Sequence, residues 1–253
     1  MKNEIKIFVY TGSCNKHSTT AILAERLVNA IEEATSLRVS VDMFSGSNVH
    51  IEECVGCTQC FMKGKCTLDI RDDLSVLRKK IQEADCVILG SPVYFHSVSG
   101  NMKKFMDRLS YWTHVMELTG KVGVVISTSG GNGLRFVSDY LKKFTDYLGI
   151  INVGVIEAAT YNEDYLKKCG VLEKLEPEFA AVAEKIREIY EEGVIPQPDD
   201  LQRTVFNMNN KKYKELEEYK EDIAEVRNWL DKGFTDFERY DDVIAEKFKC
   251  DAR

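Results

Sequence analysis

Residues 86–112 have the sequence CVILGSPVYFHSVSGNMKKFMDRLSYW. The run from 86 to 92 is short and mostly apolar, which is typical of a strand that is covered on both faces. Apolar residues then recur at helical spacing over 101–112, so the stretch predicts a strand, a loop and a helix in succession. This succession is the repeating unit of an α/β sheet.

The same unit recurs on both sides of this stretch. The patterns predict strands at 5–10, 37–44, 86–92, 122–128 and 151–159, and helices at 19–34, 72–84, 101–112, 134–149 and 179–193. Five such units are fewer than the eight of a barrel, so we expect an open, doubly wound, five-stranded parallel sheet. Residues 1–193 would form this domain, with a cysteine-rich insertion at 54–66.

The chain changes character after residue 193. Pro196 and Pro198 end the last helix and mark a boundary, so residues 194–253 are predicted to be a helical C-terminal extension with a charged helix over 213–233. The aromatic residues of the extension include Phe206, Trp229, Phe234, Phe237, Tyr240 and Phe248. A solvated surface helix is the alternative. Because the five-stranded unit looks complete, we expect the extension to pack across a subunit boundary.

Composition limits the class of protein. The chain of 253 residues is 44% hydrophobic and 30% charged, as an ordinary globular protein is. Its net charge of −7 argues against nucleic acid as the main partner. No apolar run approaches the roughly 20 residues that span a bilayer, and the early first strand leaves no room for a signal peptide. Eight cysteines in such a chain indicate a reducing cytoplasm.

Four of the cysteines lie within thirteen residues, in the run ECVGCTQCFMKGKC. Cys54, Cys57, Cys60 and Cys66 have the spacing C-x2-C-x2-C-x5-C, and Gly56 with the glycine at 64 would let the loop turn back on itself. Four clustered thiolates can bind an iron–sulfur cluster or structural zinc. Without a second cysteine triplet, all four ligands of a cluster would belong to one cubane. A zinc site, a disulfide pair and four free thiols are the alternatives.

The loop after the first strand, TGSCNKHSTT (11–20), is rich in hydroxyl groups and leads into a helix. Free N–H groups and the dipole at a helix N-terminus favour a phosphate. The residues that we expect to contact it are Ser13, Lys16, Ser18, Thr19 and Thr20. An ordinary helix cap is the alternative.

Two further strands end in unusual loops. Residues 91–105 follow the third strand, and Tyr94 and Phe95 there offer a flat apolar surface beside backbone amides. Residues 127–133 follow the fourth strand and contain three glycines that allow close approach of a ligand. The predicted ligand contacts are Ser91, Pro92, Val93, Tyr94, Phe95 and Ser97 in one loop, and Thr128, Ser129, Gly130 and Gly131 in the other. His96 is a further candidate. Together the three loops fit a flat ring with a phosphate, and FMN fits better than a dinucleotide.

These segments are similar to those of a known family. GSCNKHSTT resembles the phosphate loop of the flavodoxin-like NADPH-dependent FMN reductases, and GSPVYFHSVSGNMKKFMDR resembles their second flavin loop. CVGCTQCFMKGKCTLDIRDDL resembles the cysteine segment of the iron–sulfur flavoproteins within that group. The resemblance covers residues 4–193. Cys14 and Asn15 depart from the usual Pro-Arg of the phosphate loop, and Thr19 from the usual Asn.

The resemblance implies an oxidoreductase or electron carrier that holds FMN and one [4Fe–4S] cluster. It also implies an electron donor such as ferredoxin or NAD(P)H, and a homodimer or homotetramer. A cluster-free NAD(P)H-dependent FMN or quinone reductase is the alternative, and a flavodoxin-like carrier or regulatory module with zinc is a third possibility. No catalytic residue is assigned, since no triad or carboxylate pair stands out. Asp69, Asp72 and Asp73 are expected to cap the following helix.

Overall fold

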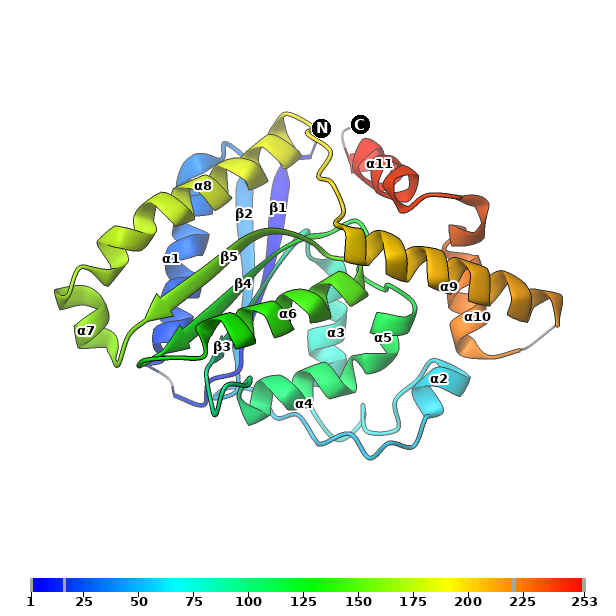
Figure 1. The fold of residues 1–253 in the computed structure, drawn as a ribbon, viewed down its shortest axis with the longest axis horizontal. Coiled ribbons are helices and arrows are strands. Elements are labelled where there is room, and N and C mark those ends of the chain that lie inside the picture. Colours follow the sequence, from blue (N-terminus) through cyan, green and yellow to red (C-terminus); the bar gives the residue numbers. More distant parts are fainter. Residues whose placement is uncertain (1, 16, 220–221, 252–253) are drawn as a thin grey trace.

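Five parallel strands form the centre of the protein in a computed structural model that describes residues 2–15, 17–219 and 222–251 (Figure 1). The strands are β1 (Glu4–Thr11), β2 (Arg38–Ser45), β3 (Cys86–Pro92), β4 (Val122–Ser129) and β5 (Ile151–Ala159). Their order is β2-β1-β3-β4-β5, and each neighbouring pair is parallel. This is the flavodoxin-like doubly wound order, so the predicted fold class is confirmed.

Helices cover both faces of the sheet. One face packs against α1 (Thr19–Ala34) and α8 (Val171–Glu191), and the other against α3 (Leu74–Glu83), α4 (Gly100–Arg108) and α6 (Leu134–Leu148). Alternation along β1 explains the two layers, because Ile7 and Val9 enter the first core while Phe8 and Tyr10 enter the second. Each such fully buried side chain contributes ~1.5–3 kcal/mol to stability.

Two predicted helices have different bounds in the structure. The helix expected at 101–112 is divided at Leu109 into α4 and the short α5 (Ser110–His114). The helix expected from 179 begins at Val171 and contains Pro177. A proline lacks the N–H that would bond one turn back, yet burial of Leu172 and Leu175 offsets that loss. A short helix that was not expected, α7 (Glu163–Lys168), precedes α8.

The extension consists of α9 (Asp200–Glu218), α10 (Ala224–Asp231), the 3-10 turn η1 (Phe234–Asp236) and α11 (Tyr240–Asp251). The continuous helix predicted over 213–233 is therefore wrong. A straight helix would hold Tyr213 and Trp229 about 24 Å apart at a rise of about 1.5 Å per residue. Their ring centroids instead lie 5.0 Å apart, both fully buried, because the chain turns back after α9.

The aromatic residues of the extension pack within their own chain. Phe206 contacts the rings of Trp229, Phe234 and Tyr240 at centroid distances of 5.6, 5.9 and 5.2 Å. Tyr240 Oη also donates to the Gly149 carbonyl at 3.1 Å, just before β5 begins. The expectation that the extension packs across a subunit boundary is therefore wrong for these rings, which form one core with the body of the chain. The domain boundary at residue 194 stays a prediction.

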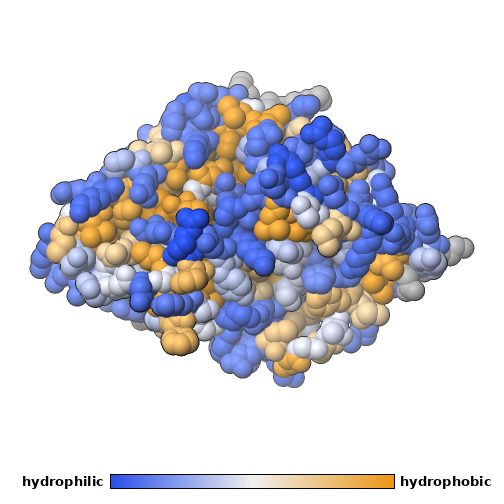
Figure 2. All heavy atoms as spheres, in the orientation of Figure 1, coloured by the Kyte–Doolittle hydropathy of each residue, from blue (hydrophilic) through white to orange (hydrophobic). Residues whose placement is uncertain are grey.

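Hydrophilic residues cover much of the face drawn in Figure 2, and apolar patches gather over the region of α8 and β5. None of the helices in the described part of the chain has both the length and the apolar character needed to cross a bilayer.

Candidate functional site

Strands β1, β3 and β4 end at the same edge of the sheet. The register pairs Thr11 with Gly90 and Pro92 with Thr128. Backbone hydrogen bonds continue past the strand ends, from Gly12 N to Gly90 O and from Val93 N to Thr128 O, both 2.8 Å. The structure thus brings the three predicted ligand loops together at the carboxyl edge, which is where doubly wound sheets bind ligands. Which residues contact a ligand there stays a prediction.

The N-terminus of α1 has the character of an anion site. Ser18 caps the helix by accepting from Ala21 N at 3.3 Å, and the first turn contains no acidic residue. Ser13 is almost fully buried nearby, and its Oγ accepts from Asn15 N at 3.1 Å. Among the described residues neither hydroxyl donates to a protein acceptor, so both can donate to a phosphate. Lys16 lies outside the described residues.

Thr20 has a different environment from the two serines. Its side chain is fully buried, and its Oγ1 lies 2.6 Å from Thr128 Oγ1. This pair links the first loop to the end of β4. The Thr20 hydroxyl therefore ties two loops together, and we expect any phosphate contact of this residue to come from its backbone N–H.

The second loop contains a tight turn from Tyr94 to Ser97, closed by backbone hydrogen bonds of 2.9 and 3.1 Å in both directions. The two central residues, Phe95 and His96, have φ of 48° and 59°. Such values suit glycine or asparagine and strain other residues. The turn exposes the whole of Phe95 and stacks His96 on Phe136, whose ring centroid is 5.2 Å away. The turn thus exposes an aromatic side chain at the edge where the three loops meet.

Three contributors to this edge were not among the predicted site residues. Ser99 caps α4 and donates from Oγ to the Gly12 carbonyl at 2.6 Å, which joins the second loop to the first. Asn101 Nδ2 lies 2.7 Å from Cys14 Sγ. Tyr161 covers Gly130 so closely that a Cβ there would lie 2.9 Å from the ring. The Ser-Gly-Asn run before a helix was a cap signal for Ser99, whereas nothing near Tyr161 in the sequence indicated its position.

The cysteine segment lies beyond the other end of α4. Cys54 and Cys57 are in irregular chain, Cys60 is in the short helix α2 (Gln59–Lys63), and Cys66 follows it. Positive φ values at Gly56 (65°), Thr58 (57°) and Gly64 (71°) turn the chain back on itself. The two glycines have the role that the sequence suggested for them.

All four cysteines line one cavity of about 140 Å³, together with Leu68 and Arg108. No three His, Cys, Asp or Glu side chains in the described part of the chain are close enough to hold one metal ion. Four thiolates are the donor set of an iron–sulfur cluster and of structural zinc, so the lining of this cavity fits either group.

The surroundings affect individual thiols. The pKa of Cys57 is lowered by a hydrogen bond from the Gln59 backbone and by Thr67, whose Oγ1 is 3.8 Å from the sulfur. The pKa of Cys60 is raised by burial. Metal binding requires thiolates, so the lowered pKa of Cys57 favours the form that binds a metal.

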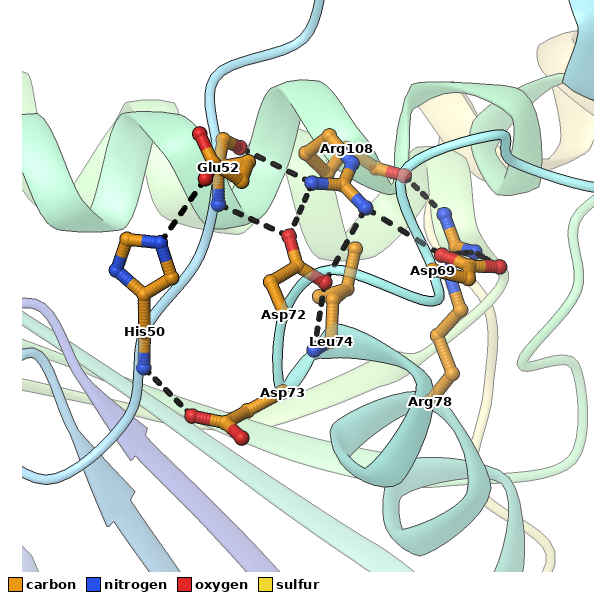
Figure 3. A network of polar contacts seen from close by, with 8 residues as sticks. All are labelled: His50, Glu52, Asp69, Asp72, Asp73, Leu74, Arg78 and Arg108. Carbon is orange, nitrogen blue, oxygen red and sulfur yellow. Dashed lines mark hydrogen bonds and ion pairs between the residues drawn. The ribbon is translucent and has the colours of Figure 1, made fainter.

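Figure 3 shows a polar network around Arg108, one of the residues that line the cysteine cavity. The Arg108 guanidinium, at the end of α4, donates to the Glu52 carbonyl at 3.1 Å and pairs closely with Asp72, whose side chain is fully buried. Asp69 pairs with Arg78 at 2.6 Å and also accepts from Arg108 at 3.3 Å. Glu52, two residues before Cys54, is thus tied directly to α4.

The expectation that three aspartates cap α3 is largely wrong. Asp72 does accept from Leu74 N at 3.1 Å, but its other oxygen accepts from Glu52 N at 2.9 Å. Asp73 accepts from His50 N at 2.8 Å and makes no side-chain cap. Asp72 and Asp73 instead bind the backbone of the segment that leads into the cysteines. Arg108 of α4 pairs with Asp72 and holds it in this position.

The C-terminal extension supports the cysteine segment from the other side. Phe61, beside Cys60, packs edge-on against the rings of Tyr111 and His114 at 5.7 and 4.9 Å. Tyr111 Oη donates to the Ala224 carbonyl at 3.2 Å, and His114 Nδ1 lies 2.9 Å from a Glu225 oxygen. The start of α10 therefore fixes the residues on which α2 rests.

Helix α4 connects the two regions. Its N-cap, Ser99, belongs to the ligand edge, and its last residue, Arg108, lines the cysteine cavity. Nine residues at a rise of about 1.5 Å give a helix about 13 Å long. Figure 1 shows α4 running from the strand ends toward α2.

Comparison with known proteins agrees with this arrangement. Residues 5–164 match the family described as NADPH-dependent FMN reductase. An iron–sulfur flavoprotein of Archaeoglobus fulgidus is 32% identical over 234 residues, which cover 88% of this chain and 96% of that protein. Another, of Methanocaldococcus jannaschii, is 33% identical over 152 residues, covering 59% of this chain and 76% of that one.

Solved structures share the fold. An oxidoreductase from Corynebacterium diphtheriae superimposes with a TM-score of 0.56 at 19% identity, covering 76% of this chain and 99% of the other. An NADH:FMN oxidoreductase superimposes with a TM-score of 0.52 at 19% identity, covering 72% and 88%.

Proposed function

Because this chain belongs to the iron–sulfur flavoprotein branch of the NADPH-dependent FMN reductase family, we propose that it transfers electrons between FMN and a [4Fe–4S] cluster. The family membership confirms the resemblance noted in the loops and the cysteine segment. The protein is a flavin-dependent oxidoreductase. FMN would lie at the carboxyl edge of the sheet, and Cys54, Cys57, Cys60 and Cys66 would hold the cluster.

Different groups of the chain would bind the phosphate and the ring of FMN. Ser13 and Ser18 would donate hydroxyl hydrogens to the phosphate at the N-terminus of α1, where the dipole favours an anion. Backbone N–H groups of the second and third loops would hold the ring edge. The exposed Phe95 ring is available to cover the flavin face.

The different electron capacities of FMN and a cluster explain why one chain would carry a flavin site and a cluster site. FMN accepts one or two electrons and a cluster only one, so the pair can connect a one-electron donor to a two-electron acceptor. The donor that we propose is a small protein such as ferredoxin, or NAD(P)H. We further propose that the chain acts in the cytoplasm as a homodimer or homotetramer.

One observation carries the proposal: the four cysteines, which come from irregular chain and a short helix, line a single cavity. Four thiols around one space are the donor set that a cluster with four thiolate ligands requires. The buried Arg108 in the wall of that cavity also suits a negatively charged group.

Anaerobic purification followed by assays of iron, acid-labile sulfide and FMN tests the proposal. We expect about four irons and one FMN per chain, since four thiolates complete one cubane. Cys57→Ser should lose most of the iron and keep the flavin. Cys169→Ser is the matched control, because Cys169 is an exposed thiol that does not line the cavity.

Two other results would contradict the proposed [4Fe–4S] cluster. About one zinc and no iron per chain would assign a structural zinc site. FMN without iron or zinc would favour a cluster-free NAD(P)H-dependent FMN or quinone reductase.

A further inference from the structure

Arg108 contacts the carboxylates of the network and also lines the cysteine cavity. Its side chain is 1% exposed. One terminal nitrogen bonds the Glu52 carbonyl and Asp72, and the other contacts Asp69 and Asp72 at 3.3 and 3.4 Å (Figure 3). All of these acceptors lie on the network side of the guanidinium.

The third donor of Arg108 has no such acceptor. Within the described residues, Arg108 Nε is fully buried without a hydrogen-bond partner. A buried N–H that lacks an acceptor is costly, and such groups call for an explanation. Arg78 Nε is also unpartnered, but Arg78 lines a neighbouring cavity with Lys65 and Tyr111, whereas Arg108 lines the cavity of the four cysteines.

The charge of Arg108 is secure in this position. A guanidinium is effectively always protonated in proteins, and that of Arg108 lies beside both the Asp72 and the Cys66 side chains. The cation is thus flanked by a carboxylate on one side and by a cysteine of the cavity on the other.

We propose that Arg108 raises the reduction potential of the cluster, as a fixed positive charge with an unused N–H donor in the wall of its cavity. This inference rests on the proposed function. A cluster with four thiolate ligands is negatively charged, and one electron adds one further negative charge without breaking a bond. Nearby positive charge and hydrogen bonds to sulfur therefore stabilise the reduced form more than the oxidised form.

The negative charge of Asp72 acts to lower the reduction potential of the cluster. Two substitutions should therefore shift that potential in opposite directions. Its side chain is fully buried, so its negative charge is poorly screened and offsets part of the arginine's charge at the cavity. Asp72→Asn keeps an acceptor for Arg108 and removes the offset, so the potential should rise. The double change Arg108→Gln with Asp72→Asn removes both charges and the Nε donor without leaving a lone buried ion, so the potential should fall.

A redox titration of the cluster, followed by electron paramagnetic resonance on the full-length holoprotein, measures both shifts. We expect each to change the ratio of reduced to oxidised cluster about tenfold at a fixed potential, which is 59 mV for a one-electron couple. The matched control is Arg78→Gln with Asp69→Asn, a second charge-neutral pair removed from the same network. It should shift the potential by less than a third as much, because Arg78 does not line the cysteine cavity.

The outcomes separate the two proposals. Wild-type protein that binds FMN but no iron contradicts the proposed function, and this inference with it. Full iron content with unchanged potentials in Asp72→Asn and in the double variant leaves the cluster in place and shows that Arg108 has only a structural role. If the double variant loses its iron, the test is the reduction potential of the cluster in the Asp72→Asn variant. A potential that is unchanged or lower in that variant overturns the inference.

Discussion

Replacing Ser13 and Ser18 together with alanine should weaken FMN binding and leave riboflavin binding almost unchanged. Both hydroxyls accept a backbone N–H, from Asn15 and Ala21 respectively, so each keeps its own hydrogen for a phosphate oxygen. A hydrogen bond to a charged group contributes ~1.5–3 kcal/mol, and two contribute ~3–6 kcal/mol. At ~1.4 kcal/mol per decade, FMN should bind roughly 100-fold more weakly or worse.

Flavin fluorescence titrations with FMN and with riboflavin measure the two affinities. Riboflavin lacks the phosphate, so it reports any general damage to the ring site. Loss of the Ser18 cap should lower the free energy of unfolding by ~0.5–2 kcal/mol, which a urea titration measures separately.

Thr20→Val is the matched control for this prediction. The Thr20 hydroxyl is engaged by Thr128 at 2.6 Å, so its loss should destabilise the fold by ~1–3 kcal/mol without favouring one flavin over the other. An equal loss of FMN and riboflavin in the double serine variant would place the phosphate elsewhere. Strong discrimination by Thr20→Val would show that the Thr20 hydroxyl, not the serines, binds it.

Three further predictions concern the extension, the cysteine segment and pH. Trp229→Ala should lower the free energy of unfolding by ~3–5 kcal/mol in urea titrations, because Trp229 is fully buried; a loss below ~1 kcal/mol would mean that the extension packs loosely. Phe61→Ala should reduce the iron content but not the FMN content, since Phe61 fixes α2 on Tyr111; equal iron in variant and wild type would contradict this support. Burial raises the pKa of Asp146 to about 6 from 3.8, so its stabilising contribution is present below pH 4 and is lost as the pH rises through 6. Relative to Asp146→Asn, the wild type should lose roughly 2 kcal/mol of unfolding free energy between pH 4 and 7, and parallel pH profiles would refute the assignment.

The sequence by itself determined the sheet, its five strand–helix units and the position of the ligand loops. These features are local: a strand or helix shows its own period, and parallel strands must end at one edge. The cysteine spacing likewise named four candidate ligands, because close neighbours in the chain can share a cavity whatever the rest of the fold does. Even the turns at Gly56 and Gly64 were visible as residue types that tolerate positive φ.

Only the tertiary structure decided how distant segments meet. The partner of Asp72 is Arg108, 36 residues away, and no periodic pattern marks an ion pair between a loop and the end of a helix. Burial drives Trp229 back onto Tyr213 and thereby breaks a helix that its charged sequence would have continued. The same turn brings α10 against the residues that support α2. Packing free energy is gained between faces that become neighbours only after folding, so propensity along the chain could not predict these contacts.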